Sequence, residues 1–224
     1  MTDSKHNTHS KDVETFFHGY AKDFSSIYEE DERPRSAFNL LMDKLFRQDI
    51  KDRFDETIKE VKKDSIQSIL DIGCGPGHFV LKFLEMGKSV TALDIAQGML
   101  DITNARVSSV KTESKFESIL ADYSEYKFQE QFDAICVMGF FDYVSDPTAV
   151  LKKLLSEASK EIYISFPDDY GMLAWQRKIR YARRNCPLYL YNESKIKMHL
   201  QEAGCLELSE IKKTNRNFYV TIRK

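Results

Sequence analysis

The residues with the clearest chemical potential are the glycines of a short turn. The segment reads Ile69-Leu70-Asp71-Ile72-Gly73-Cys74-Gly75-Pro76-Gly77-His78-Phe79. An apolar run that ends in an acid, followed by alternate glycines and then a helical pattern, predicts a buried strand, a tight turn and a helix N-terminus. Glycines let the backbone approach a ligand closely, and a helix start offers unpaired N–H groups and a partial positive charge. The turn is therefore predicted to bind a ligand that carries a carboxylate or a phosphate.

The spacing of the glycines favours one class of nucleotide ligand. A dinucleotide fingerprint would place its third glycine at position 78, but that residue is His78 and the third glycine is Gly77. With Asp71 two residues before the first glycine, the pattern resembles the first motif of class I S-adenosylmethionine-dependent methyltransferases. The resemblance covers residues 68–166 in detail and the flanks by pattern only. A nicotinamide dehydrogenase is an alternative that the displaced third glycine disfavours.

The elements that must position this turn alternate between strand and helix from residue 68 onward. Strands are predicted at 68–72, 90–93, 116–120, 132–138 and 161–165, with helices at 77–86, from 96, and at 147–156. Such alternation is typical of a parallel sheet with right-handed crossovers. A helix from Asn192 to Gly204 and two strands at 206–211 and 218–222 follow, and their short polar turn suits a hairpin. One of these two strands must then be antiparallel to the rest.

The resemblance implies an α/β fold, a Rossmann-like three-layer sandwich with a seven-stranded, mostly parallel sheet that has one antiparallel strand, plus an N-terminal helical lid. A single class I methyltransferase domain is expected over residues 1–224. Within it, 1–11 is expected to be a disordered tail, 12–64 the N-terminal helices and lid, and 168–191 an acceptor-side insertion.

The composition excludes several other classes of protein. The chain of 224 residues is 42% hydrophobic with a formal net charge of -2, which gives no electrostatic case for bulk nucleic-acid binding. No apolar run approaches the roughly 18 residues of a membrane helix, and residues 1–11 lack the apolar segment of a signal peptide, so a cytoplasmic location is expected. The four cysteines have no C-x-x-C spacing, so neither a metal site nor a disulfide framework is predicted.

Two acids at predicted strand ends are candidates for holding a nucleoside. Asp94 ends the second strand, where a carboxylate can accept hydrogen bonds from both ribose hydroxyls. Apolar side chains of Ile95 and Met99 would contact adenine, although a methionine here is more often part of a core. After the third strand, Asp122 resembles the family's acid that accepts the adenine amino group, and Tyr123 would supply a backbone N–H.

The resemblance also implies a set of contacts to the methionine part of the cofactor. Asp71 would be linked to the glycine loop or to the cofactor ammonium group, and Met138 and Gly139 would lie beside the methionine portion and the transferred methyl. Arg53 is a candidate partner for the cofactor carboxylate; a solvated helix charge is the alternative.

Aromatic residues near the N-terminus suggest a lid. Tyr20, Phe24 and Tyr28 recur every four residues, so a helix would align them on one face. Phe24 or Tyr28 could close over the methionine moiety and exclude water; a helix packed on the core is the alternative. Ser36 is predicted to cap a longer amphipathic helix that covers one face of the sheet.

Methyl transfer from a sulfonium requires alignment and exclusion of water, and in some cases removal of a proton. The segment 138–144 lacks the Asn/Asp-Pro-Pro-aromatic motif of DNA amino-methyltransferases, so a DNA acceptor is not expected, and its aromatic pair suggests an apolar acceptor pocket. Asp142 and Tyr143 are weak candidates for a general base, as is His18. His78 is a further candidate, with a structural role as its alternative.

A basic stretch in the expected insertion bears on the acceptor. It comprises Arg177, Lys178, Arg180, Arg183 and Arg184. A solvated amphipathic helix, recognition of an acidic or phosphorylated acceptor, and docking to a partner or membrane surface are all open. The leading hypothesis is S-adenosylmethionine-dependent methylation of a small molecule, at oxygen before nitrogen, by a monomer or homodimer. The alternatives are an RNA or protein methyltransferase and a non-catalytic cofactor-fold binding protein.

Overall fold

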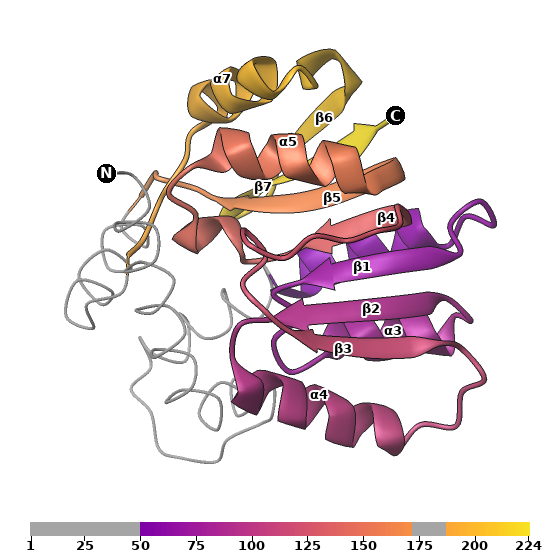
Figure 1. Cartoon of the computed structure of the whole chain (residues 1–224). Helices are drawn as coiled ribbons and strands as arrows, with labels where there is room; N and C mark the ends of the chain where they lie inside the picture. Colours follow the sequence, from indigo (N-terminus) through magenta and orange to yellow (C-terminus); the bar gives the residue numbers. More distant parts are fainter. Residues whose placement is uncertain (1–49, 172–186) are drawn as a thin grey trace.

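The computed structural model describes residues 50–171 and 187–224, which form one seven-stranded sheet with helices on both of its faces (Figure 1). The strand order is β3-β2-β1-β4-β5-β7-β6. In chain order the strands are β1 Ser68–Ile72, β2 Ser89–Asp94, β3 Phe116–Leu120, β4 Phe132–Val137, β5 Ala158–Pro167, β6 Ser209–Lys213 and β7 Asn217–Arg223. The helices are α3 His78–Glu85, α4 Gln97–Ser108, α5 Pro147–Glu157 and α7 Glu193–Ala203, with short 3-10 turns η1 Phe141–Tyr143 and η2 Leu206–Leu208. A further helix occupies residues 50–61.

The direction of the strands confirms the predicted sheet. The strands from β1 to β5 pair in parallel, whereas β7 pairs antiparallel with both β5 and β6. Only β7 is therefore reversed within this sheet, and the hairpin between β6 and β7 is the predicted one. The expectation of a mostly parallel, seven-stranded sheet with one reversed strand is confirmed.

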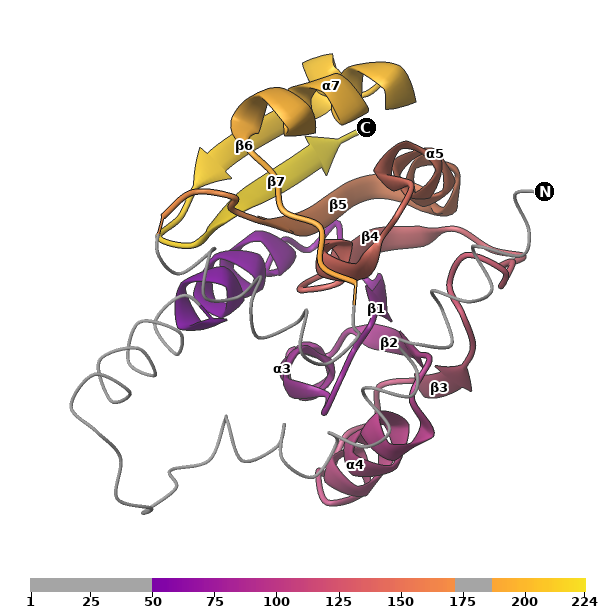
Figure 2. The ribbon, with the colours of Figure 1, turned by 90° about the vertical axis from the view of Figure 1, so that its left-hand side faces the viewer.

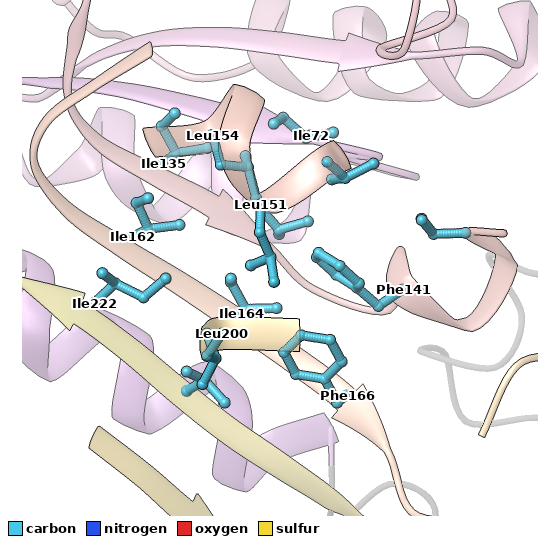
Figure 3. Close-up of a cluster of buried hydrophobic side chains, with 14 of the residues drawn as sticks. Ile72, Ile135, Phe141, Leu151, Leu154, Ile162, Ile164, Phe166, Leu200 and Ile222 are labelled. Atoms are coloured by element: carbon cyan, nitrogen blue, oxygen red, sulfur yellow. The ribbon is translucent and has the colours of Figure 1, made fainter. Parts of the chain in front are cut away.

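Alternation of side chains along the strands builds two separate cores. On one face, Leu70 and Ile72 of β1 pack toward α5 and α7 in a large apolar cluster (Figure 3). On the other face, Ile69 packs with residues of α3, α4 and the helix at 50–61. The view along the sheet shows α3 and α5 on opposite sides of it (Figure 2). This arrangement is the predicted three-layer sandwich, because strands buried on both faces need helices on both.

Some element boundaries differ from the sequence prediction. The strand predicted at 206–211 begins as the 3-10 turn η2, and only Ser209–Lys213 pairs with β7. The strand was predicted to start at 206 because apolar residues alternate at 206 and 208. β5 extends the predicted strand at 161–165 to Ala158–Pro167, because Ala158 also pairs with β4, and Phe166 and Pro167 also pair with β7. In α7, Asn192 caps the N-terminus and Gly204 the C-terminus, as predicted.

Several predictions concern residues outside those that the structure describes. These are the tail at 1–11, most of the lid at 12–64 including the Ser36 cap, and the basic stretch at 177–184. Among the described helices, none combines the length and the apolar character needed to span a bilayer.

An ionic network lies at the edge of the sheet where the parallel strands begin. Lys63 contacts Glu60 and Glu161, each at 2.8 Å, and Arg223 bridges Glu60 and Glu210. The last residue of the chain is tied to the same edge, because the backbone N–H of Lys224 donates to the carbonyl of Lys160 near the start of β5.

Candidate cofactor and acceptor site

The candidate site lies at the edge of the sheet where β1, β2, β3 and β4 end. β1 is flanked by β2 on one side and by β4 on the other, so the connections diverge at this point. In open α/β sheets such a switch point at the carboxyl ends of the strands is where ligands bind. The predicted glycine turn connects β1 to α3 here.

The three glycines of the turn all have a left-handed backbone, but their surroundings differ. Their φ angles are 66° at Gly73, 54° at Gly75 and 79° at Gly77. A Cβ on Gly73 would lie 3.3 Å from the ring of Phe140, and one on Gly77 would lie 2.7 Å from Thr103. At Gly75 no atom of the described residues would lie within 4 Å. Gly75 is therefore the glycine at which a ligand can approach, whereas the other two accommodate the protein's own side chains.

Asp94 ties the glycine loop to the following strand–helix connection. Its Oδ2 accepts from the backbone N–H of Gly75 and its Oδ1 from that of Ala96, both at 2.9 Å. Burial raises the pKa of this carboxyl, while the surrounding backbone N–H groups act in the opposite direction. Each carboxylate oxygen has two lone pairs, so both oxygens can accept a further hydrogen bond.

Asp71 is a buried acid with an unsatisfied oxygen. It lies in register with Cys136 on β4, and its Oδ2 has no hydrogen-bond partner within the described residues. Burial raises its pKa to about 7, against a smaller lowering by the Cys136 thiol, and the nearby charge of Asp94 adds to the increase. A buried carboxylate oxygen without a partner costs free energy unless a donor or cation reaches it.

Arg53, on the helix at 50–61, reaches the ends of β4 and β5. Its guanidinium donates to the hydroxyl of Ser165 at 3.1 Å, and that hydroxyl accepts from the backbone N–H of Gly139 at 2.8 Å. The side chain is half-buried, unlike a solvated helix charge. Its position next to Gly139 places a cation at the end of the site where the methionine portion was predicted.

The turn after β3 carries the predicted adenine-side acid. Oδ1 of Asp122 accepts from the backbone N–H and the hydroxyl of Ser124. Tyr123 is buried, and its hydroxyl donates to Glu157 of α5 at 2.7 Å, while Lys153 lies 4.7 Å from its ring centroid. The Tyr123 side chain thus anchors the turn, which leaves only its backbone for the predicted ligand contact.

The apolar residues predicted to contact the cofactor are not equally accessible. Ile95 and Met138 are half-buried, whereas Met99 is 1% exposed and packs with Ala96 and Ile102. Met99 is thus part of a small buried cluster, which was the alternative interpretation of a methionine at this position. Its contact with adenine stays a prediction.

The predicted acceptor side comprises η1 and residues 187–191, which return to the same edge. The carbonyl of Asp142 accepts from the backbone N–H of Tyr189 at 2.8 Å, and the Tyr191 hydroxyl donates to the carbonyl of Phe141 at 3.3 Å. Asp142 is buried and Tyr143 is half-buried. Both base candidates therefore lie beside the end of β4, where an acceptor would meet a cofactor bound on the glycine loop.

His78 has a structural environment. Its Nε2 lies 3.1 Å from Nη1 of Arg106, and burial together with this positive charge lowers its pKa to about 4. The imidazole is neutral at physiological pH and directed at a cation, which favours the structural alternative over a general base.

Sequence analysis did not identify Thr103, Arg106 or Ser165, which make direct contacts to the site. The only available signal for Thr103 was a polar residue four positions after Met99, on the same face of the helix. His18, Phe24 and Tyr28 lie outside the described residues.

With this geometry established, comparisons with known proteins identify the domain. Residues 69–160 match the family model described as a methyltransferase domain. Residues 69–160 therefore carry a methyltransferase domain. The expectation drawn from the glycine spacing is thereby confirmed.

Two curated relatives illustrate the similarity. The chain is 32% identical over 98 residues to a ubiquinone biosynthesis O-methyltransferase of Hydrogenovibrio crunogenus, covering 43% of this chain and 40% of that protein. It is 34% identical over 89 residues to a malonyl-[acyl-carrier protein] O-methyltransferase of Serratia marcescens, covering 39% of this chain and 32% of that protein. These matches span less than half of the relatives' own length.

Among solved structures, the magnesium protoporphyrin IX methyltransferase from Synechocystis PCC 6803 with bound SAH superimposes with a TM-score of 0.75. The match covers 96% of this chain and 99% of that chain at 15% identity, which establishes the similarity of the fold.

Proposed function

We propose that this protein is an S-adenosylmethionine-dependent methyltransferase that methylates a small molecule, at oxygen before nitrogen. The observation that carries the proposal is the arrangement of Asp71, the glycine loop and Asp94 at the switch point of the sheet. Here a buried carboxylate oxygen without a described partner adjoins a loop whose central glycine leaves room for a ligand.

Each polar group of the cofactor has a side chain of complementary charge or hydrogen-bonding capacity in the site. The free oxygen of Asp71 would accept the cofactor ammonium, and Asp94 would accept the ribose hydroxyls. Arg53, beside Gly139, would bind the cofactor carboxylate, and Asp122 would accept the adenine amino group. Gly75 allows the backbone to approach the ligand without a Cβ in the way.

The bound cofactor supplies an electrophilic methyl group on a sulfonium. The protein must then hold an acceptor lone pair in line with the S–CH3 bond at about 3 Å and keep water out. Aromatic side chains after β4 serve this purpose, since Phe140 packs against Gly73 and stands edge-on to Tyr123 at 6.0 Å between ring centroids. Asp142 or Tyr143 would take the proton from a hydroxyl acceptor.

The names of the relatives support oxygen as the acceptor atom. The ubiquinone biosynthesis enzyme and the malonyl-[acyl-carrier protein] enzyme are both O-methyltransferases. The two names refer to different acceptors, so the proposal names the atom and leaves the acceptor class to experiment. The RNA or protein alternative depends on the basic stretch at 177–184, outside the described residues.

Calorimetric titration tests the cofactor assignment. S-adenosylhomocysteine should bind with one site per chain, and NAD should not bind under the same conditions. Absence of S-adenosylhomocysteine binding, or tighter binding of NAD, would overturn the proposal.

An acceptor screen tests the reaction. Phenols, catechols, carboxylic acids and amines are incubated with S-adenosylmethionine, and formation of S-adenosylhomocysteine is measured. Turnover with oxygen acceptors is expected, and turnover confined to amines would refute the choice of atom. RNA binding that weakens with added salt would instead favour the macromolecular alternative.

A further inference from the structure

We propose that Thr103 and Arg106 of α4 are positioning residues that fix the conformation of the glycine loop for cofactor binding. The inference rests on the proposed function for its ligand, but the contacts that support it are properties of the protein alone. Both residues act on the ligand only through the loop.

Thr103 contacts the loop at two points. Its buried hydroxyl donates to the carbonyl of Gly75 at 2.8 Å. Its Cγ2 and Oγ1 also occupy the space that a Cβ on Gly77 would need, at 2.7 Å each. The third glycine of the motif is therefore required by a side chain of α4, which fills the space next to it.

Arg106 continues this contact one helical turn further along α4. Its guanidinium donates to the carbonyl of Pro76 at 2.8 Å and lies 3.1 Å from Nε2 of His78, the first residue of α3. Because His78 is neutral at physiological pH, it can accept this hydrogen bond. Arg106 thus connects the loop and the start of α3 to α4.

Gly75 is therefore held from both sides by one continuous segment of the chain, the end of β2 and the following helix α4. Its N–H donates to Asp94 at the end of β2, and its carbonyl accepts from Thr103 of the helix that follows. The peptide nitrogen after Gly75 belongs to Pro76 and has no hydrogen to donate, so the carbonyl contact carries the anchoring of this peptide unit. The position that is open to a ligand is consequently set by β2 and α4.

The test compares loss of the hydroxyl with loss of a methyl group. Thr103→Val keeps the shape and removes the hydrogen bond, whereas Thr103→Ser keeps the hydroxyl. Titration with S-adenosylhomocysteine should show about tenfold weaker binding for Thr103→Val, the scale of one lost hydrogen bond to a buried carbonyl, and near-normal binding for Thr103→Ser. Arg106→Met should weaken binding in the same direction, and Arg106→Lys should recover part of the loss.

A matched control separates positioning from general destabilisation. Thr221 is a buried threonine on β7, away from the loop, so Thr221→Val should leave affinity unchanged even if it lowers the melting temperature. Wild-type affinity in Thr103→Val, or equal weakening by Thr103→Val and Thr221→Val, would overturn the inference.

Hydrogen exchange distinguishes failure of this inference from failure of the proposed function. If the wild-type protein does not bind S-adenosylhomocysteine, the proposed function fails. Faster exchange of the amides of Gly73, Cys74, Gly75 and Gly77 in Thr103→Val than in Thr103→Ser would still support the anchoring of the loop. Identical exchange in the two variants would contradict it.

Discussion

The two halves of the candidate site are built differently. On the β1–β2 side, the glycine loop is held by backbone and side-chain hydrogen bonds from Asp94, Thr103 and Arg106. On the β4–β5 side, the strand ends rest on a buried aromatic cluster, with Phe141 and Phe166 at 4.4 Å and Phe166 and Tyr191 at 5.0 Å between ring centroids. The polar contacts there run from Arg53 through Ser165 to Gly139. The proposed cofactor half, the glycine loop with Asp94, therefore has fixed polar geometry, whereas the proposed acceptor half, η1 with residues 187–191, is supported mainly by apolar packing.

This difference suggests how the two halves can change in evolution. Directional hydrogen bonds fix one backbone conformation for one ligand, since a buried polar group that loses its partner is costly. Apolar packing tolerates replacement by side chains of similar volume at smaller cost. We therefore expect the acceptor half to vary with the substrate while the cofactor half is retained.

The largest expected effect comes from filling the space between the third glycine and α4. Gly77→Ala forces a Cβ against Thr103 and places alanine at a φ of 79°. Gly87→Ala is the control, because its φ is 78° and no described atom lies near its Cβ position. The left-handed backbone should cost each variant about 1–2 kcal/mol, and the clash should cost Gly77→Ala a further 1–3 kcal/mol or so.

Urea unfolding measures this difference. Equal losses of stability in the two variants would show that α4 does not restrict the loop. Adding Thr103→Ala to Gly77→Ala should recover part of the loss, because it removes the atoms with which the new Cβ clashes.

The next effect tests the ribose assignment. Asp94→Ala should weaken binding of S-adenosylhomocysteine by about 1–3 kcal/mol, the scale of lost charge-assisted hydrogen bonds. Asp101→Ala, on the exposed face of α4, is the control and should bind normally. Unchanged affinity in the Asp94 variant, measured by calorimetry, would refute the assignment.

An effect on stability that depends on pH should come from Asp71. Its folded-state pKa is raised to about 7 from an ordinary value of 3.8, so the folded protein retains this proton longer than the unfolded chain does. The stabilisation is complete below the ordinary pKa and is lost as the pH rises through the folded-state value. The amide introduced by Asp71→Asn does not titrate, so this variant does not lose this stabilisation as the pH rises. The free energy of unfolding of the variant minus that of the wild type should therefore increase between about pH 4 and 7.

Unfolding in urea at several pH values checks this prediction. Other groups, including His78, titrate in both proteins and cancel in the difference. A difference between the two proteins that does not vary with pH would contradict it.

The smallest effect on cofactor binding is expected in the acceptor half. Tyr143→Phe should leave affinity for S-adenosylhomocysteine within about twofold, because Tyr143 is not among the proposed cofactor contacts. If Tyr143 removes the acceptor proton, turnover should fall by about 10²–10⁴. A large loss of cofactor affinity would show that the two halves are not separable in this way.

The sequence predicted best those features that depend on neighbouring residues. β1 was predicted at its observed limits, Ser68–Ile72, because an apolar run, an acid and glycines all indicate the same boundary. Asp94 was predicted at a strand end, and the structure places it against the glycine loop.

Contacts between distant segments could not be predicted in the same way. Thr103 meets Gly75 only because α4 crosses back beside the loop, and Ser165 meets Arg53 across 112 positions of the chain. The buried position of the Tyr123 ring depends on Glu157 of α5, which no local pattern reveals. Such contacts depend on how the helices pack against the sheet. They cannot be predicted from the spacing of residue types along the sequence.

The reversed direction of β7 has a practical consequence for studying this protein. Because β7 runs against its neighbours, it carries Lys224 to the ionic edge, where the Lys160 carbonyl receives its N–H, while the glycine loop lies across the full length of the strands. A surface tether joined at Lys224 would leave the candidate site on the side of the sheet that faces away from the surface (Figure 1). Immobilised protein prepared in this way should remain accessible to bulky acceptors.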